Sequence, residues 1–363
     1  MTQPEQDTAA ANEPAEQPEA LHNSRFLKAC RGEATDCTPI WLMRQAGRYM
    51  SNYRAIRAEH SMLDVIQTPA LAAEVTLQPI EAFDLDAAII FSDILPPLIG
   101  MGMDLDFVKG VGPKLATPLD TPADVDKLTV PKAVDCMGPT LEAISIVRKA
   151  LEPRGIPLIG FAGAPFTLAC YAIQGSGSKM YEKAKQFMYS HPESWAVLMN
   201  KLVDVVVDYL LRQAEHGASA LQVFDSWAGI LSVGDYQRFI QPHNTRLFAE
   251  IEAAGVPTIN FSTGTSTHLD QVAKCGGDVI GVDWRQPLDR SREVIGMDRP
   301  IQGNMDPTAL LAPWPELQKQ ADSVLQQADG QAGHIFNLGH GILPMTPVES
   351  VKQLVEYVHE QTA

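Results

Sequence analysis

The amino-acid sequence predicts an α/β fold, namely a single-domain (β/α)8 TIM barrel with a hairpin inserted after the second strand. Eight short apolar segments alternate with segments of helical length, and no stretch with the composition of a domain linker separates them. Several of the eight are apolar on both faces, which is typical of parallel strands covered by helices. This alternation favours a closed barrel, and an open doubly wound sheet is the alternative. The expected strands are residues 40–43, 87–91, 157–161, 219–224, 257–261, 279–283, 301–304 and 335–338.

The first 22 residues differ from the rest of the chain, and we expect them to form a disordered acidic tail ahead of a barrel domain at residues 23–363. The tail contains Pro, Asp and Glu residues but no Lys or Arg. Such a composition buries too little apolar surface to offset the entropy lost on ordering. It also lacks the features of a secretory signal, and no later run is long enough to span a membrane. We therefore expect a cytoplasmic protein with no membrane partner.

The charge and cysteine content restrict the possible partners. The 28 Lys and Arg residues against 44 Asp and Glu residues give a formal net charge of −16, which argues against nucleic acid as a ligand. The five cysteines are widely spaced and include no pair with zinc-ligand spacing. We therefore expect reduced thiols and no metal site.

Signals along the chain define the individual elements. Asn23 or Ser24 is suited to cap a first helix, and helical patterns follow at residues 62–83 and 196–215. Between the second and third strands, residues 99–117 carry repeated glycines that interrupt short alternating pieces, which indicates the inserted hairpin. The last helix is expected to open with a capping box that begins at Thr346.

The functional residues are expected where the strands end. In a parallel barrel the active site lies at the carboxyl ends of the strands, so side chains that follow different strands meet at one mouth. The polar residues at these positions are Arg44, Arg48, Asp93, Tyr171, Ser226, Asp283, Asn304 and His340. Each has an ordinary structural explanation when taken alone: Asp93 and Ser226 are suited to cap a turn or helix, and His340 to be a satisfied loop histidine. Their shared position is what favours a site.

Arg44 and Arg48 give this mouth its chemical character. They follow the first expected strand four residues apart, with Gly47 between them. A guanidinium group holds a carboxylate through two hydrogen bonds and stays charged at any working pH. One interpretation is a clamp for an anionic ligand, and the alternative is ordinary surface ion pairing.

Other common catalytic motifs are absent from the sequence. The segment 175–179 lacks the spacing of a phosphate-binding loop, and Ser226 lacks the glycine that a nucleophile elbow needs two residues earlier. No lysine ends an expected strand, which removes the usual anchor for a Schiff base.

Several longer motifs resemble one enzyme family. The segments Pro39-Ile-Trp-Leu-Met-Arg-Gln-Ala-Gly-Arg-Tyr49 and Gly160-Phe-Ala-Gly-Ala-Pro-Phe-Thr-Leu168 are similar to the two signatures of the uroporphyrinogen decarboxylase family. Ile90-Phe-Ser-Asp-Ile-Leu95 and Asn337-Leu-Gly-His-Gly341 also match. These motifs reach across the chain from residue 39 to residue 341. Trp227 and Met345 depart from the residues expected in many relatives.

The resemblance implies a function and a set of site residues. The family removes the four acetate carboxyl groups of uroporphyrinogen III as CO2, giving coproporphyrinogen III in porphyrin and heme biosynthesis, without a cofactor and usually as a homodimer. Carried over by position, the catalytic residues are Asp93 and Arg44. The substrate-binding residues are Arg44, Gln45, Ala46, Gly47, Arg48, Asp93, Tyr171, Ser226 and His340.

Chemical reasoning agrees with this assignment but leaves the proton donor open. A pyrrole that is protonated beside the departing carboxylate acts as the electron sink, and a fixed carboxylate such as Asp93 stabilises the resulting cation. An arginine is a poor acid on pKa grounds, although mechanisms proposed for the family include one, and the other candidate donors are a substrate carboxylic acid, a water molecule and His340. The main alternative function is a cobalamin-linked methyltransferase of the same barrel superfamily, which would need a zinc site of His and Cys.

Overall fold

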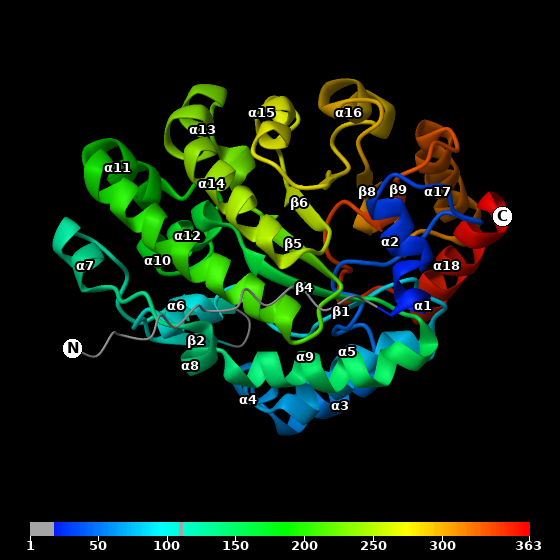
Figure 1. Ribbon diagram of the computed structural model, residues 1–363, viewed down its shortest axis with the longest axis horizontal. Helices are drawn as coiled ribbons and strands as arrows, with labels where there is room; N and C mark the ends of the chain where they lie inside the picture. Colours follow the sequence, from blue (N-terminus) through cyan, green and yellow to red (C-terminus); the bar gives the residue numbers. More distant parts are fainter. Residues whose placement is uncertain (1–17, 109–111) are drawn as a thin grey trace, which may run out of the picture.

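A curled sheet of seven parallel strands forms the centre of the protein. The computed structural model describes residues 18–108 and 112–363. The strands are hydrogen-bonded in the order β1-β4-β5-β6-β7-β8-β9, and each pair is parallel. Figure 1 shows these strands at the centre with helices around the outside. The strands are β1 Ala88–Ile89, β4 Leu158–Gly163, β5 Ala220–Asp225, β6 Thr258–Ser262, β7 Val279–Gly281, β8 Ile301–Met305 and β9 His334–Leu338. The predicted α/β barrel architecture is confirmed.

The predicted first strand, residues 40–43, joins the two edges of this sheet with few ladder bonds. Only Ile40 makes a bridge, to Phe336 of β9, and its carbonyl accepts the N–H of Asp86 next to β1. Side chains take the place of the missing ladder. The N–H of Leu42 donates to the Gln45 side chain at 3.1 Å, and the N–H of Met43 donates to the Asn337 side chain at 3.0 Å. The segment is therefore anchored by side-chain amides rather than by a continuous ladder.

Two further strands lie between β1 and β4 in the sequence. β2 Leu105–Val108 and β3 Gly112–Leu115 pair antiparallel in the region where the hairpin is expected, and residues 109–111 between them lie outside the described residues. Leu115 donates its N–H to the carbonyl of Gly175 at 2.8 Å. This pair therefore packs against the loop that follows α10.

The helices occupy the segments between the strands. They are α1 Glu19–His22, α2 Arg25–Cys30, α3 Ser51–Glu59, α4 Met62–Gln67, α5 Pro69–Ala82, α6 Pro96–Gly100, α7 Pro122–Lys127, α8 Ala133–Cys136, α9 Gly138–Leu151, α10 Pro165–Gln174, α11 Glu182–Ser190, α12 Pro192–Glu215, α13 Val233–Phe239, α14 Gln241–Ile251, α15 Leu269–Lys274, α16 Leu288–Ile295, α17 Trp314–Ala328 and α18 Val348–Thr362. Short 3-10 turns are η1 Glu152–Arg154, η2 Ala228–Ile230, η3 Glu252–Ala254 and η4 Pro307–Leu311. No helix in the described ranges is long and apolar enough to cross a membrane.

The arrangement of the core leaves one end of the barrel available for a site. A large cluster of buried side chains fills the space between the sheet and the helices. A second cluster combines Phe26 and Leu27 of α2 with inward residues near the starts of the strands, such as Ile159 and Ile259. Because α2 packs at the strand starts, it covers the amino-terminal end of the barrel, and the carboxyl-terminal end remains open to side chains from the loops.

Three expectations about local structure are corrected. The predicted tail 1–22 lies mostly outside the described residues, but Glu19–His22 form α1 with Leu21 fully buried, so the boundary at residue 22 is wrong. The helical segment 62–83 breaks at Thr68, because Pro69 disfavours a helical conformation in the residue before it. The capping box at Thr346 does not form: Pro347 is the N-cap residue, and the Thr346 hydroxyl is buried without a partner among the described residues.

Candidate active site

Arg44 occupies a strained turn directly after residues 40–43, the first strand segment of the barrel. Its φ of 60° lies in the left-handed region, which is uncommon for a residue other than glycine and is concentrated at functional sites. The turn is held by the Gln45 N–H, which donates to the Leu42 carbonyl at 2.9 Å, and by the Tyr49 hydroxyl, which donates to the Gln45 carbonyl at 2.7 Å. The turn leaves the Arg44 side chain exposed at the end of a buried strand.

The rest of the arginine motif divides into supporting and exposed residues. The Gln45 side chain is buried and donates to the Ala87 carbonyl at 3.1 Å, so this side chain fixes the turn, while Ala46 and Gly47 are half-buried. Arg48 is exposed. Within the described part of the chain, neither the Arg44 nor the Arg48 guanidinium forms an ion pair, a hydrogen bond or a ring contact. Among the described residues, ordinary surface ion pairing therefore does not account for Arg44 and Arg48.

Asp93 follows β1 at the start of a turn into α6. One carboxylate oxygen of Asp93 accepts the N–H of Leu95 at 3.0 Å. Asp93 therefore caps a turn, which was the purely structural role considered for it from the sequence. Burial raises the pKa of this carboxyl, and the backbone N–H of Leu95 and the charge of Arg44 oppose that rise. The carboxylate is thus fixed in direction by the backbone and lies in the field of an arginine without being paired to it.

Tyr171 reaches the same region from α10, which follows β4. Its ring is half-buried and contacts Tyr181 and Trp227, with ring centroids 5.9 and 6.3 Å apart. Burial raises the pKa of Tyr171, Asp93 raises it further, and Arg44 lowers it. The tyrosine therefore lies within electrostatic reach of both charged residues of the mouth.

Ser226 and the residue before it mark the end of β5. Ser226 is half-buried, and its carbonyl accepts the Thr263 hydroxyl at 2.6 Å. Asp225, the last residue of β5, is buried and accepts the Thr167 hydroxyl at 2.9 Å. Burial raises the pKa of Asp225 to about 6 despite this bond and a second one from Asn244. Asp225 therefore connects the end of β5 to Thr167 in α10 and Asn244 in α14, and sequence reasoning did not predict these contacts.

His340 lies on the other side of Arg44, in the loop after β9. Burial lowers the pKa of His340 to about 4, with further lowering by Arg44 and Arg285, while Asp283 raises it. Asp283 is buried at the end of β7 and forms an ion pair with Arg285. The histidine is consequently neutral near pH 7 in the absence of ligand.

Gly341 allows the close approach between this loop and Arg44. A Cβ atom added at Gly341 would lie 2.4 Å from Arg44 Cδ and 2.9 Å from Arg44 Nε. Real Cβ atoms do not approach other atoms so closely. The glycine therefore lets the Arg44 side chain lie directly over the loop after β9.

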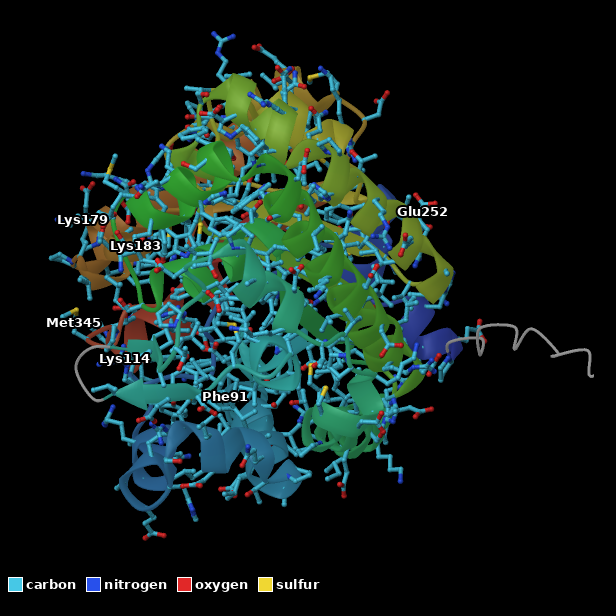
Figure 2. All side chains as sticks on the ribbon, turned by 90° about the vertical axis from the view of Figure 1, so that its left-hand side faces the viewer. Phe91, Lys114, Lys179, Lys183, Glu252 and Met345 are labelled. Atoms are coloured by element: carbon cyan, nitrogen blue, oxygen red, sulfur yellow. The ribbon has the colours of Figure 1, made fainter. Side chains whose placement is uncertain are left out.

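Three lysines lie at the end of the molecule that carries the mouth (Figure 2). Figure 2 shows Lys114, Lys179, Lys183 and Met345 along one edge of the molecule, and Glu252 on the opposite side. Glu252 lies in η3, shortly before β6 begins, whereas Met345 follows β9, so the lysine edge is the carboxyl-terminal end of the barrel. None of the three lysines forms an ion pair with any residue that the structure describes. These lysines, with Arg44 and Arg48, place cationic groups without ion pairs among the described residues at this end of a chain of net charge −16.

The structure places some of the predicted site residues close together and leaves others apart. Arg44, Asp93, Tyr171 and His340 lie within one electrostatic neighbourhood centred on Arg44. No contact between described residues links the side chains of Arg48 or Ser226 to this group. Asn304 instead donates its side-chain amide to the carbonyls of Asp283 and Gln286 at 2.9 and 2.7 Å, which makes it a support for the β7 loop. Sequence reasoning missed Tyr181 and Arg285, which carry no signal of their own at the level of residue type. It assigned no role to Gly341, although this glycine ends one of the matched motifs.

No group of three or more His, Cys, Asp or Glu side chains in the described ranges is arranged to hold a metal ion. His340 has Arg44, Arg285 and Asp283 as its charged neighbours, and no cysteine is among them. The zinc site that a cobalamin-linked methyltransferase would need thus has no counterpart in this part of the mouth.

Comparison with known proteins agrees with the sequence motifs. A family model described as uroporphyrinogen decarboxylase matches residues 21–361. The uroporphyrinogen decarboxylase of Sorangium cellulosum is 49% identical over 337 residues, covering 93% of this chain and 96% of that protein. The corresponding protein of Roseiflexus sp. is 48% identical over 348 residues, covering 94% and 100%. Among solved structures, a methyltransferase from Methanosarcina mazei superposes with a TM-score of 0.78 at 21% identity over 93% and 98% of the two chains, a likeness of fold alone.

Proposed function

The chain belongs to the uroporphyrinogen decarboxylase family, and from that premise we propose how its barrel mouth binds substrate and performs the reaction. The enzyme is a carboxy-lyase that converts the four acetate side chains of uroporphyrinogen III to methyl groups and releases four CO2 molecules. The assignment of residues depends mainly on Arg44. Its guanidinium is exposed and has no ion pair among the described residues. It also lies within electrostatic reach of Asp93, Tyr171 and His340.

Arg44 and Arg48 bind substrate carboxylates in this proposal. Uroporphyrinogen carries eight carboxylates, which a protein with a net charge of −16 repels overall. Two guanidinium groups without partners among the described residues lose no ion pair seen there when they bind an anion, and each is suited to hold a carboxylate through two hydrogen bonds. Gln45, Ala46 and Gly47 shape the turn between them and contribute backbone to the pocket wall. The lysines at the mouth reduce the repulsion of the approaching anion.

Asp93 stabilises the positive charge that develops on the substrate. A pyrrole protonated on the carbon next to the acetate accepts the electron pair released as the C–CO2 bond breaks, so the substrate itself supplies the electron sink and no added cofactor is needed. The four pyrrole N–H groups of the macrocycle are suited to converge on one carboxylate. Hydrogen bonds from those N–H groups favour the ionised form of Asp93 and offset the effect of burial on its pKa. Because Leu95 already fixes the carboxylate, little reorganisation is needed during the reaction.

Tyr171, Ser226 and His340 complete the proposed binding site. The Tyr171 hydroxyl donates a hydrogen bond to a substrate carboxylate, and Ser226 offers a second hydroxyl from the neighbouring strand end. His340 is neutral in the free enzyme because burial and Arg44 lower its pKa to about 4. It therefore acts first as a hydrogen-bonding group, and it becomes a proton donor only if bound substrate carboxylates raise that pKa.

The activity is tested directly by incubating the purified protein with uroporphyrinogen III under reducing, anaerobic conditions and separating the products by their number of carboxylates. We expect products with seven, six, five and finally four carboxylates, without added metal or organic cofactor. A reaction that requires an added cofactor, or no loss of carboxylates at all, would contradict the proposal.

We also propose that the enzyme works as a cytoplasmic homodimer, as the family resemblance implies. Light scattering coupled to size-exclusion chromatography should then give roughly twice the chain mass of 39.6 kDa. A monomeric mass at assay concentration would rule out the dimer, and cell fractionation tests the location.

A further inference from the structure

Three aromatic side chains from different elements meet beside the proposed substrate site. Tyr171 belongs to α10, Tyr181 lies directly before α11, and Trp227 lies between β5 and η2. The ring centroids of Tyr181 and Trp227 are 4.8 Å apart, and both rings lie close to Tyr171. Tyr181 has a left-handed backbone with a φ of 47° and is fully buried. A bulky residue rarely adopts this conformation, so the surrounding packing holds the Tyr181 ring in place.

Two polar hydrogens in this cluster have no acceptor within the described ranges of the chain. The hydroxyl of Tyr181 and the indole nitrogen of Trp227 are both buried and form no hydrogen bond of normal geometry with any described residue. A buried donor without a partner is destabilising, and such groups in a folded protein call for an explanation. Both donors nevertheless lie close enough to the Tyr171 hydroxyl to lower its pKa against the dominant effect of burial. Because the rings of Tyr181 and Trp227 also both contact the Tyr171 ring, we infer that the Tyr171 oxygen is their acceptor when a ligand is bound.

The chemistry of these three groups fixes the direction of one proton. A tyrosine hydroxyl offers one donor and two acceptor lone pairs, and an indole N–H only donates. If Tyr181 and Trp227 both donate to the Tyr171 oxygen, the single Tyr171 proton must point away from them, toward the mouth where Asp93 and Arg44 lie. Tyr181 is too deeply buried to touch a ligand itself, so any effect it has on the reaction passes through Tyr171.

We propose that Tyr181 and Trp227 are positioning residues that donate to the Tyr171 hydroxyl in the substrate complex, and thereby direct the Tyr171 proton onto a carboxylate of the substrate. This inference rests on the proposed substrate contact of Tyr171. The two donors remain without a good acceptor until substrate draws the Tyr171 proton outward, which makes the Tyr171 oxygen a better acceptor. Ligand binding thus satisfies two buried donors at once.

The test is a double-mutant cycle on decarboxylation of uroporphyrinogen III. Tyr181→Phe keeps the ring and removes only the hydroxyl, and we expect kcat/KM to fall about fivefold to tenfold, the effect of one lost hydrogen bond. In the Tyr171→Phe background the same change should have less than a twofold effect, because Tyr181 has nothing left to position. Trp227→Phe should resemble Tyr181→Phe, whereas Trp227→His, which retains a ring N–H donor, should recover part of the activity.

A matched control separates this role from general packing. Tyr357→Phe removes a hydroxyl that donates to Asp322 between α17 and α18, away from the mouth, and should leave kcat/KM within twofold of wild type. The positioning role is wrong if the fold-changes in kcat/KM of Tyr171→Phe and Tyr181→Phe multiply in the double variant. It is also wrong if neither Tyr181→Phe nor Trp227→Phe lowers activity. Failure of the underlying substrate assignment is distinguishable, because Arg44 and Asp93 variants would then also retain near-normal activity.

Discussion

The glycine beside Arg44 offers a sharp test of whether the position of this guanidinium matters. The Cβ of Gly341→Ala would lie 2.4 Å from Arg44 Cδ and 2.6 Å from Arg44 Cγ. Carbon atoms in contact are separated by about 3.5 Å, so the arginine side chain must move by roughly 1 Å. A misplacement of about 1 Å at a reacting centre can lower the rate about 100-fold. We expect Gly341→Ala to lower kcat/KM by about 10-fold to 100-fold.

The same substitution should barely affect stability. Arg44 is exposed, and its long side chain can move aside into solvent, so we expect the free energy of unfolding to change by less than about 1 kcal/mol. Gly339→Ala, two residues earlier, should behave in the opposite way. Its Cβ would lie 2.4 Å from the backbone nitrogen of Trp284, which cannot move without disturbing the β7 loop. We expect that variant to lose about 1–3 kcal/mol of stability, as overpacked cores do.

The assay combines steady-state decarboxylation with urea unfolding of the same preparations. Gly234→Ala is the matched control, because a Cβ there meets nothing within 4 Å and its backbone has no positive φ. It lies in α13, so it should keep full activity and gain up to about 1 kcal/mol. If Gly341→Ala retains the wild-type kcat/KM, the precise position of the Arg44 guanidinium is unimportant and the clamp assignment is wrong.

Three further predictions concern single residues. Asp93→Asn keeps the shape of the side chain but removes its charge, so decarboxylation should fall at least about 100-fold; near-normal turnover would show that this charge does not stabilise the reaction. Arg44→Ala should lower kcat/KM about 10-fold to 100-fold, the effect of one charge-assisted hydrogen bond, whereas Arg154→Ala, which removes a surface pair with Glu81, should stay within twofold; equal effects would count against the clamp. Burial lowers the pKa of His334 from 6.5 to about 4, so the unfolded state binds the proton first as pH falls. Between pH 7 and pH 5 the wild type should therefore lose about 2 kcal/mol more stability than His334→Gln, as measured by urea unfolding, and equal losses would refute this origin of acid sensitivity.

Strand ends were predictable from the sequence because they follow from periodicity and position. Apolar runs bounded by polar residues located the strands, and parallel topology then placed the residues after each run at one mouth. This reasoning correctly brought Arg44, Asp93, Tyr171 and His340 into one neighbourhood. It could not distinguish Asn304, which follows the same positional rule but supports a loop, because the direction of a side chain at a strand end depends on neighbours from other strands.

Features that depend on long-range contacts escaped prediction. The sequence predicts an ordinary strand at residues 40–43, yet the N–H groups of Leu42 and Met43 donate to the side chains of Gln45 and Asn337. Asn337 lies almost 300 positions further along the chain. The left-handed backbone of Tyr181 has no signature at all, because nothing local in a Met-Tyr-Glu sequence favours it. Strain of this kind is maintained by tertiary packing, and that packing is specified by many residues together.

The two explanations considered for Asp93 turn out to be compatible, and their combination has a consequence for specificity. As a turn cap, Asp93 is held by Leu95, and burial raises the pKa of its carboxyl in the free enzyme. In the proposed complex, a ligand that presents four converging N–H groups favours the ionised carboxylate, whereas an oxidised free-base porphyrin offers two such hydrogens and a metal-bound one offers none. In that proposal, the substrate itself favours the carboxylate charge that stabilises the reaction. The proposal therefore predicts weaker binding of oxidised porphyrins than of porphyrinogens, with Asp93 as the source of the difference and the arginines of the mouth recognising only that the ligand is an anion.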